Sequence, residues 1–157
     1  MKKVIHIEHN FLSPEECEAV VGFYQVFAHE AFHYETNNTF PIDLKNHSEL
    51  DGVHDRVLSL AQSLGQKSYR LDNHELVKWV PTSKMGLHKD FTHDDWSAIL
   101  YLNDNFFGGN TLFEGNLRVS PQRGTIIMFN GCNLLHGVDP VLNGDRYTMA
   151  YWLKENA

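Results

Sequence analysis

Apolar residues near the start of the chain recur at helical spacing. Ser13 and Pro14 precede this stretch, and Glu16 stands three residues after Ser13. This arrangement is typical of a capping box, in which Ser13 and Glu16 each bond to the other's backbone N–H. The apolar residues that follow lie three and four positions apart: Cys17, Val20, Val21, Tyr24 and Phe27 or Ala28. They predict a helix with one buried face.

A second helix is predicted from about Ser48 to Leu64. Its apolar stripe comprises Leu50, Val53, Val57, Leu60, Ala61 and Leu64. We expect Gly65 to end this helix. Residues 29–47, between the two helices, are aromatic and polar without a clear period. We interpret them as a loop with room for a short strand.

From Tyr69 onward the pattern changes to short apolar runs separated by turn residues. The runs cover Leu76–Val80, Lys84–Asp90, Ser97–Leu102, Thr111–Phe113, Leu117–Val119, Thr125–Phe129, Leu134–Val138 and Arg146–Leu153, in addition to Val4–Ile7 near the start. Many short strands at this spacing indicate a sandwich or barrel. We therefore expect one domain over residues 1–157, mainly β, with the two N-terminal helices packed on the outer face of one sheet.

Composition narrows the class of protein. Hydrophobic residues make up 42% and charged residues 21% of the chain, as in ordinary globular domains. The net charge of −7 disfavours a nucleic-acid partner, and no apolar run is long enough for a membrane span or a signal peptide. Cys17 and Cys132 allow one disulfide, but two reduced thiols in a cytoplasmic protein are the simpler interpretation.

The most informative pattern is a pair of histidines with one aspartate. His88 and Asp90 are two residues apart in a predicted strand, so their side chains point to the same face. His136, in another predicted strand, can complete a 2-His-1-carboxylate set, the arrangement of non-heme iron(II) oxygenases. Taken alone, His88-Lys89-Asp90 is more often a chance triplet on a surface turn, and only the joint pattern with His136 and Arg146 is specific. The neighbouring His93-Asp94-Asp95 is a rival cluster, which we interpret as a solvated loop at the mouth of the site.

Arg146 begins the last predicted strand. Alternation places four residues on one face of this strand: Arg146, Thr148, Ala150 and Trp152. A guanidinium that faces the interior needs an anion, and its planar fork suits a carboxylate. Tyr101 could add a hydroxyl to the same anion. The alternatives are a solvent-exposed arginine at a strand end and a core tyrosine with a satisfied hydroxyl.

The segment from His88 to Trp152 resembles the catalytic core of prolyl 4-hydroxylase-like iron(II)/2-oxoglutarate dioxygenases. The matching residues are His88-x-Asp90, Tyr101-Leu102-Asn103, Gly108-Gly109-Asn110-Thr111-x-Phe113, Val119-x-Pro121-x-x-Gly124, Phe129, Leu135-His136-Gly137-Val138-x-Pro140-Val141, Gly144-x-Arg146 and Trp152. The opening segment 11–17 is also similar to the family's N-terminal helix start. The resemblance therefore spans nearly the whole chain.

This resemblance implies a double-stranded β-helix core, also called a jelly-roll or cupin-like core. It implies iron(II) held by His88, Asp90 and His136. It further implies 2-oxoglutarate with its far carboxylate on Arg146 and Tyr101. The other residues that it assigns to the cosubstrate pocket are Ile99, Thr111, Val138 and Trp152. Dioxygen is the other implied cosubstrate, and ascorbate is a further candidate cofactor. The implied reaction hydroxylates an unactivated C–H bond while 2-oxoglutarate is converted to succinate and carbon dioxide.

Two departures from the family concern the substrate. Met85 and Trp79 stand at positions where tyrosine is frequent in the family. The retained Asp90 argues against the related halogenases, which have a small residue there. We expect a prolyl residue of a peptide or protein as the substrate, with a free amino acid or another small molecule as the alternative. Outside the enzyme class, the alternative is a non-catalytic jelly-roll that senses a metal or carboxylate. A zinc-dependent hydrolase is disfavoured, because no glutamate stands beside a ligand histidine in a recognised arrangement.

Aromatic residues flank the predicted site. Those in the two flanking segments, 29–47 and Phe91–Trp96, are Phe32, Tyr34, Phe40, His93 and Trp96. We hypothesise that these segments form the mouth of the cleft, where a ring such as proline packs against aromatic faces. Alternatively, the same aromatic residues cap the barrel core.

Overall fold

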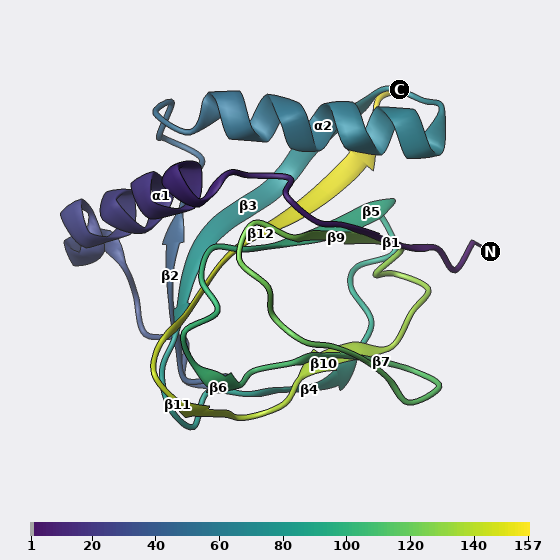
Figure 1. Cartoon of the computed structure of the whole chain (residues 1–157). Coiled ribbons are helices and arrows are strands. Elements are labelled where there is room, and N and C mark those ends of the chain that lie inside the picture. The colour runs from purple at the N-terminus through teal and green to yellow at the C-terminus, as the bar shows by residue number, and fades with distance from the viewer. Residues whose placement is uncertain (1) are drawn as a thin grey trace.

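The computed structural model describes residues 2–157 of the chain. Two β-sheets face each other, and both helices lie on the outer face of the larger sheet (Figure 1). Helix α1 spans Pro14–Val26 and α2 spans Asp51–Gly65, with the short 3-10 helix η1 at Ala28–Glu30 between them. The prediction of a mainly β fold with N-terminal helices on one sheet is confirmed.

The larger sheet has six strands in the order β1-β9-β5-β12-β3-β2. Their bounds are β1 Ile5–Glu8, β9 Ile126–Phe129, β5 Trp96–Tyr101, β12 Arg146–Glu155, β3 Tyr69–Trp79 and β2 Thr39–Asp43. The opposite sheet has four strands in the order β4-β10-β7-β8. Their bounds are β4 Met85–His88, β10 His136–Val138, β7 Thr111–Phe113 and β8 Leu117–Val119. Strands β6 (Phe107–Gly108) and β11 (Val141–Asn143) form a separate pair. Two opposed antiparallel sheets of this kind are the predicted double-stranded β-helix.

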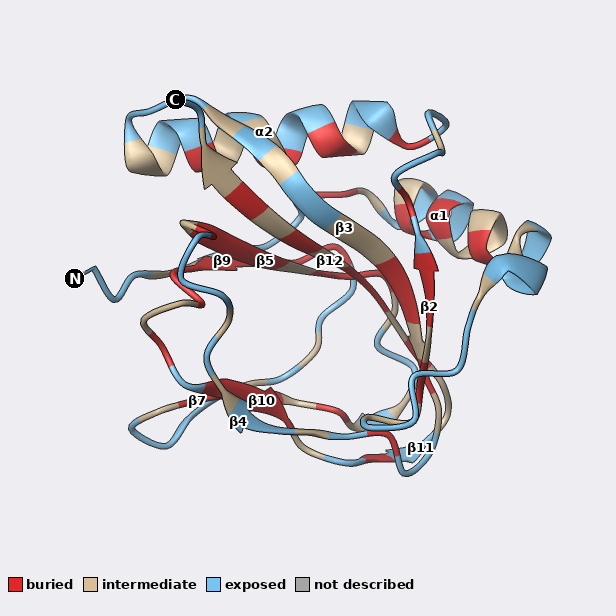
Figure 2. Cartoon of the chain, turned by 180° about the vertical axis from the view of Figure 1, so that it is seen from behind, coloured by how far each residue is buried: buried red, intermediate tan, exposed pale blue. Residues whose placement is uncertain are grey.

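The helices cover the larger sheet through their apolar stripes. Figure 2 shows buried residues on one side of α1 and α2 and along the sheet beneath them. The buried helix residues belong to the same core cluster as sheet residues; they are Cys17, Val20 and Tyr24 of α1 and Val57 and Ala61 of α2. Removing this apolar area from water is the main force that fixes the helices on the sheet.

The helix ends were predicted in part. The Glu16 N–H donates to Ser13 Oγ over 3.1 Å and the Ser13 N–H donates to Glu16 Oε1 over 2.9 Å, so the capping box is confirmed. Helix α2 ends at Gly65, as predicted, although it starts at Asp51 and the left-handed residue after it is Gln66, with φ 56°. A Cβ at position 65 would collide with the Tyr69 hydroxyl, so a larger residue there would require the Tyr69 side chain to shift.

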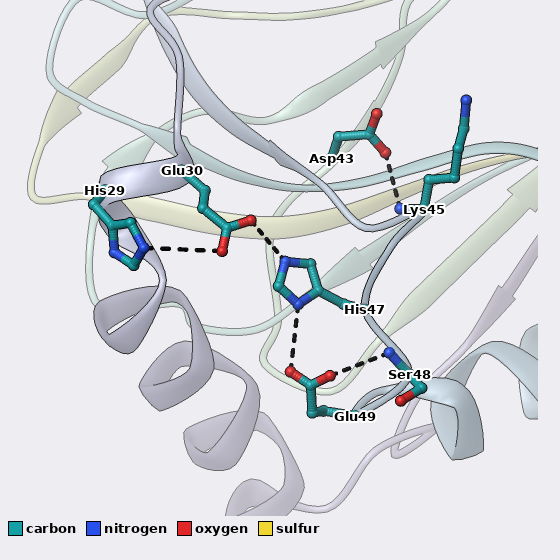
Figure 3. Close-up of polar contacts among 7 residues, drawn as sticks. All are labelled: His29, Glu30, Asp43, Lys45, His47, Ser48 and Glu49. Atoms are coloured by element: carbon teal, nitrogen blue, oxygen red, sulfur yellow. Dashed lines mark hydrogen bonds and ion pairs between the residues drawn. The ribbon is translucent and has the colours of Figure 1, made fainter.

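Polar contacts organise the segment between the helices (Figure 3). His47 Nε2 lies 2.8 Å from Glu30 Oε1, and His47 Nδ1 lies 3.3 Å from Glu49 Oε2. Glu30 belongs to η1 and Glu49 precedes α2, so His47 joins the two helical segments. The hydrogen bond to Glu30 raises the pKa of His47. Nearby, the Asp43 carboxylate accepts a hydrogen bond from the Lys45 N–H over 2.9 Å.

Several strand limits differ from the prediction. Strand β4 ends at His88, so Asp90 lies beyond the strand and not on it. The chain turns there because the Asp90 N–H donates to the Gly131 carbonyl over 2.9 Å. Strand β3 starts at Tyr69, well before the predicted Leu76, because its polar first half also pairs with β12. Strands β6 and β11 were not predicted, since such short strands leave no alternation to recognise.

Two further expectations concern cysteines and membranes. Cys17 and Cys132 are both free thiols, as the simpler interpretation required. Within residues 2–157, the helices are too short or too polar to cross a lipid bilayer.

Candidate metal centre

His88, Asp90 and His136 converge at one end of the smaller sheet. Strands β4 and β10 pair so that His88 lies opposite His136, and their ring centroids are 4.4 Å apart. Asp90 Oδ1 lies 3.4 Å from His88 Nε2 and 3.3 Å from His136 Nε2. One potential ligand atom from each residue falls within 4.8 Å of the others. The structure therefore brings together the three side chains for which the sequence predicts a metal.

Both imidazoles are held with Nε2 toward the aspartate. His88 Nδ1 donates to the Gly86 carbonyl over 2.9 Å, and His136 Nδ1 donates to the Leu134 carbonyl over 2.8 Å. A hydrogen bond from Nδ1 to a carbonyl leaves Nε2 as the nitrogen that faces a metal, as is common for metal-binding histidines. The His88 side chain is 37% exposed and that of His136 only 4%. The triad is thus open on the His88 side.

The Asp90 carboxylate is also held from the larger sheet. Ser97 Oγ on β5 donates to Asp90 Oδ2 over 2.5 Å. Gly131 packs against the same atoms, and a Cβ there would collide with both. Burial by itself would raise the pKa of Asp90, but hydrogen bonds with His136, His88 and Ser97 outweigh it and hold the pKa well below its ordinary value. Asp90 is therefore ionised, as a metal ligand must be.

Arg146 is buried at the start of β12 with its side chain toward the interior. Its Nε donates to the Gly109 carbonyl over 2.9 Å. Its Cζ lies 4.5 Å from the centroid of the Trp79 ring and 5.5 Å from that of Tyr101. Nη1 and Nη2 have no hydrogen-bond partner among the described residues. Burial lowers the pKa of Arg146, but a guanidinium stays charged in proteins. An unpaired buried cation is strongly unfavourable, so these two nitrogens are arranged for an anion.

A cavity of about 520 Å³ joins the triad to Arg146. Its volume is that of a small-molecule site. Strand β12 lines it with Arg146, Thr148, Ala150 and Trp152. The alternation predicted for this strand is therefore confirmed, because all four side chains face the same cavity.

The other predicted pocket residues fall into two groups. Ile99, Val138 and Trp152 line the cavity. Tyr101 and Thr111 lie behind its wall, where both are completely buried and the Tyr101 hydroxyl bonds to Thr111 Oγ1. Burial raises the pKa of Tyr101, so its hydroxyl stays protonated beside the guanidinium.

The prediction of which aromatic residues form the mouth of the cleft is correct in part. Phe32, Tyr34 and His93 line the cavity, and Phe32 and Tyr34 are 52% and 46% exposed. Phe40 and Trp96 do not belong to it. Phe40 stacks on His33 with ring centroids 4.8 Å apart. Trp96 is buried in the core that the helices share with the larger sheet.

The rival cluster is less solvated than predicted. The Asp94 side chain is only 2% exposed, and Asp72 on β3 joins it and His93. His93 Nε2 lies 3.0 Å from Asp72 Oδ2 and 3.7 Å from Asp94 Oδ2. Burial, and then the neighbouring Asp72, raise the pKa of Asp94 to about 7. All three residues line the cavity, so the cluster makes its rim acidic.

Some residues of the site were not found from the sequence. Asn73 and Glu75 of β3 line the cavity, but the predicted strand began only at Leu76. Alternation extended backward from Trp79 would have found them. Ser97 and Gly131 left no signal, because a buried hydroxyl and a close backbone approach depend on the tertiary structure.

Comparison with known proteins identifies the family. The family model described as the 2OG-Fe(II) oxygenase superfamily matches residues 72–154. The chain belongs to this superfamily. The matched segment contains the triad and Arg146. The family resemblance inferred from the sequence is confirmed.

Relatives and solved structures agree with this assignment. Human prolyl 3-hydroxylase 3 and rat prolyl 3-hydroxylase 1 are each 41% identical over an alignment of 69 residues. The alignment covers 40% of this chain but only 9% and 10% of those proteins. The chain thus spans a small part of the length of these relatives.

Three solved structures show the same fold at low sequence identity. The viral collagen prolyl hydroxylase of Paramecium Bursaria Chlorella virus-1 has a TM-score of 0.76 and 17% identity, covering 98% of this chain and 96% of that one. A Pseudomonas putida prolyl-4-hydroxylase has a TM-score of 0.77 and 17% identity, covering 99% and 95%. HygX from Streptomyces hygroscopicus, with nickel and 2-oxoglutarate bound, has a TM-score of 0.81 and 15% identity, covering 98% and 84%.

Proposed function

We propose that this 2OG-Fe(II) oxygenase hydroxylates prolyl residues of a peptide or protein. The observation that carries the proposal is the cavity that joins the triad to the two unpaired guanidinium nitrogens of Arg146. 2-Oxoglutarate suits this cavity, since its oxo-acid end can approach a metal while its far carboxylate meets a buried cation.

The residues present fit iron(II). Two imidazoles and one ionised carboxylate form the triad, and this donor set with an open side is that of non-heme iron(II) oxygenases. When bound, iron supplies the activation of dioxygen for attack on an unactivated C–H bond. In the overall reaction, 2-oxoglutarate, dioxygen and the substrate give succinate, carbon dioxide and the hydroxylated substrate.

The chain's own residues orient the reactants and exclude water. Ser97 holds the Asp90 carboxylate. At the far end, Arg146 receives the second carboxylate of 2-oxoglutarate, with the neutral Tyr101 hydroxyl beside it. Val138 and Trp79 belong to an apolar cluster at this end. Because they keep water out, the pairing of carboxylate and guanidinium is stronger than it would be in solvent.

A prolyl substrate is supported by the similarity to prolyl 3-hydroxylases and by the cavity mouth. Phe32 and Tyr34 offer exposed aromatic faces on which a pyrrolidine ring can pack. Met85 lines the cavity where the family often has tyrosine, so the wall near His88 is apolar in this chain. A free amino acid remains the alternative substrate.

The test is a reaction of the iron-loaded protein with 2-oxoglutarate in air. Succinate is quantified, and proline-containing peptides and free amino acids are screened by mass spectrometry for the gain of one oxygen atom. We expect oxidation of a peptide at proline. Oxidation of free amino acids alone would replace the peptide substrate, and 2-oxoglutarate binding without succinate would indicate a sensor. Reactions with and without ascorbate test that cofactor, which remains a prediction, as does a cytoplasmic location.

A further inference from the structure

Glu75 of β3 is a carboxylate inside the cavity that has no hydrogen-bond or ion-pair partner among the residues that the structure describes. It lines the cavity between Asn73 and Val77. Burial, and then the neighbouring Asp43, raise the pKa of Glu75 to about 7, and no hydrogen bond or cation within residues 2–157 opposes this shift. A half-buried carboxylate is disfavoured unless a positive group or a donor meets it.

Strands β3 and β12 together form one wall of the cavity, which we call its floor, and Glu75 and Arg146 lie at different ends of it. Glu75 is paired with Ala150 of β12, whereas Arg146 is paired with Trp79. The Glu75–Ala150 pair is four residues from the Trp79–Arg146 pair, or about 13 Å along the strands. The floor thus carries a buried cation at one end and an unpaired carboxylate farther along. The small Ala150 leaves space beside Glu75.

The acidic groups around Glu75 are only partly paired within the protein, where His93 Nε2 lies 3.0 Å from Asp72 and 3.7 Å from Asp94. Asp43 lies opposite Glu75 on β2, but its carboxylate is turned to the Lys45 N–H (Figure 3). Asp72 and Asp94 add acidity at the rim. The cavity lining contains one lysine, Lys89, and one arginine, Arg146. Because Arg146 belongs to the opposite end, acids outnumber bases in the part of the cavity that remains for the substrate.

We propose that the substrate carries a positively charged guanidinium or ammonium group near the hydroxylated carbon, and that Glu75 pairs with this group. This inference rests on the proposed function and narrows its substrate to proline-containing peptides with arginine or lysine close to the proline. A cation from the substrate would compensate the desolvation of Glu75, whereas a neutral isostere would leave the carboxylate unpaired. The neutral analogue should bind more weakly, because it leaves the Glu75 carboxylate without a partner.

The experiment measures binding without turnover. The protein is loaded with iron(II) and 2-oxoglutarate under nitrogen and titrated with two labelled peptides that differ only in arginine or citrulline next to the proline. We expect at least a tenfold preference for the arginine peptide. Glu75→Gln should abolish the preference, and Glu75→Lys should reverse it toward a peptide with glutamate at that position. Asp43→Asn is the matched control: it removes a neighbouring acid that raises the pKa of Glu75, so the preference for the arginine peptide should persist or increase. Free arginine and citrulline, used as competitors, show whether a free amino acid supplies the cation.

Equal affinity for the arginine and citrulline peptides in the wild type overturns the inference, as does a preference that survives Glu75→Gln. Formation of succinate in air without peptide is measured on the same preparations. Its presence with no charge preference means that only the inference fails, whereas its absence in the wild type means that the proposed function fails. Because binding does not need turnover, the charge preference is decided in both cases.

Discussion

The Arg146 guanidinium lies over the indole of Trp79, with Cζ 4.5 Å from the ring centroid, and the two residues are paired directly across β12 and β3. The indole is itself fixed, because Trp79 Nε1 donates to Thr148 Oγ1 over 3.2 Å. A cation over an aromatic face gains attraction without using its hydrogen-bond donors. Trp79 thus stabilises the buried charge of Arg146 and leaves two nitrogens free for an anion.

Replacing Arg146 with alanine should raise the apparent KM for 2-oxoglutarate far more than it weakens iron binding. Loss of a buried charge-assisted contact costs on the order of 2–5 kcal/mol. Arg146→Lys should be milder, because the charge survives but the planar fork does not. Succinate formation is measured against 2-oxoglutarate concentration, and iron binding is measured separately. An unchanged 2-oxoglutarate dependence in Arg146→Ala would remove Arg146 from the cosubstrate site.

The triad should be required for both turnover and metal binding. His88→Ala, Asp90→Ala and His136→Ala should each stay folded and lose iron-dependent succinate formation. A ligand at about a hundred times its Kd stabilises the native state by about 2.7 kcal/mol, so manganese(II) should raise the Tm of the wild type and not of these variants. His93→Ala, in the second cluster, is the control and should respond like the wild type. Wild-type activity in all three triad variants would show that the ligand assignment is wrong.

Because Ser97 and Gly131 hold the Asp90 carboxylate in place, substitutions at these two positions should weaken metal binding. Ser97→Ala removes a hydrogen bond to the carboxylate, and loss of such outer contacts typically lowers metal affinity by about 10- to 100-fold. Gly131→Ala should do at least as much, because its Cβ would displace the carboxylate itself. Gly22→Ala in α1 meets no atom within 4 Å and serves as the control. Titration with manganese(II) measures all three, and wild-type affinity in Gly131→Ala would contradict the close packing described for Asp90.

The sequence predicted the fold wherever alternation or helical spacing was long enough to recognise. The four inward residues of β12 and the capping box at Ser13 are such cases. The site was predicted through its residue types, since two histidines and an aspartate are informative even when Asp90 lies outside its strand. Glu75 was missed because it stands in a polar run whose strand character comes from pairing with β12. Asp94 was misjudged because its burial results from packing against distant residues.

His54 should make the fold sensitive to acid. It is 3% exposed, and its Nδ1 lies 2.9 Å from the Tyr151 hydroxyl. Burial, and then the nearby His74, lower the pKa of His54 to about 4. The unfolded chain binds a proton at this histidine below about pH 6.5, whereas the folded chain does not until the pH is much lower. Stability should therefore fall from pH 6.5 toward pH 4, by a loss on the order of 3 kcal/mol.

The matched variant for this effect is His54→Gln, which keeps a polar partner for Tyr151 but cannot titrate in this range. Urea unfolding of both proteins at several pH values between 7 and 4 gives the free energy of unfolding. The wild type should lose more stability than His54→Gln over this window. If the free energy of unfolding falls equally with pH in the two proteins, groups other than His54 cause the acid sensitivity.

The aromatic mouth should matter for the peptide and not for 2-oxoglutarate. Segment 29–47 contains β2, so its role is tested by substituting single side chains, which leaves the strand in place. Phe32→Ala combined with Tyr34→Ala should lower the rate of peptide hydroxylation steeply and leave uncoupled succinate formation in place. Phe107→Ala removes another exposed aromatic, 69% exposed, away from the cavity lining. If peptide hydroxylation is unaffected in the double variant, the peptide enters elsewhere.

The triad draws on both sheets of the barrel. His88 and His136 belong to the smaller sheet, while Asp90 is tied through Ser97 to the larger one. If iron is held there as proposed, it links the smaller sheet to the larger one through Asp90 and Ser97. A ligand that binds only the native state shifts the population away from open forms, and open forms are those that proteases cut. The lifetime of this protein in a cell would then follow the supply of iron.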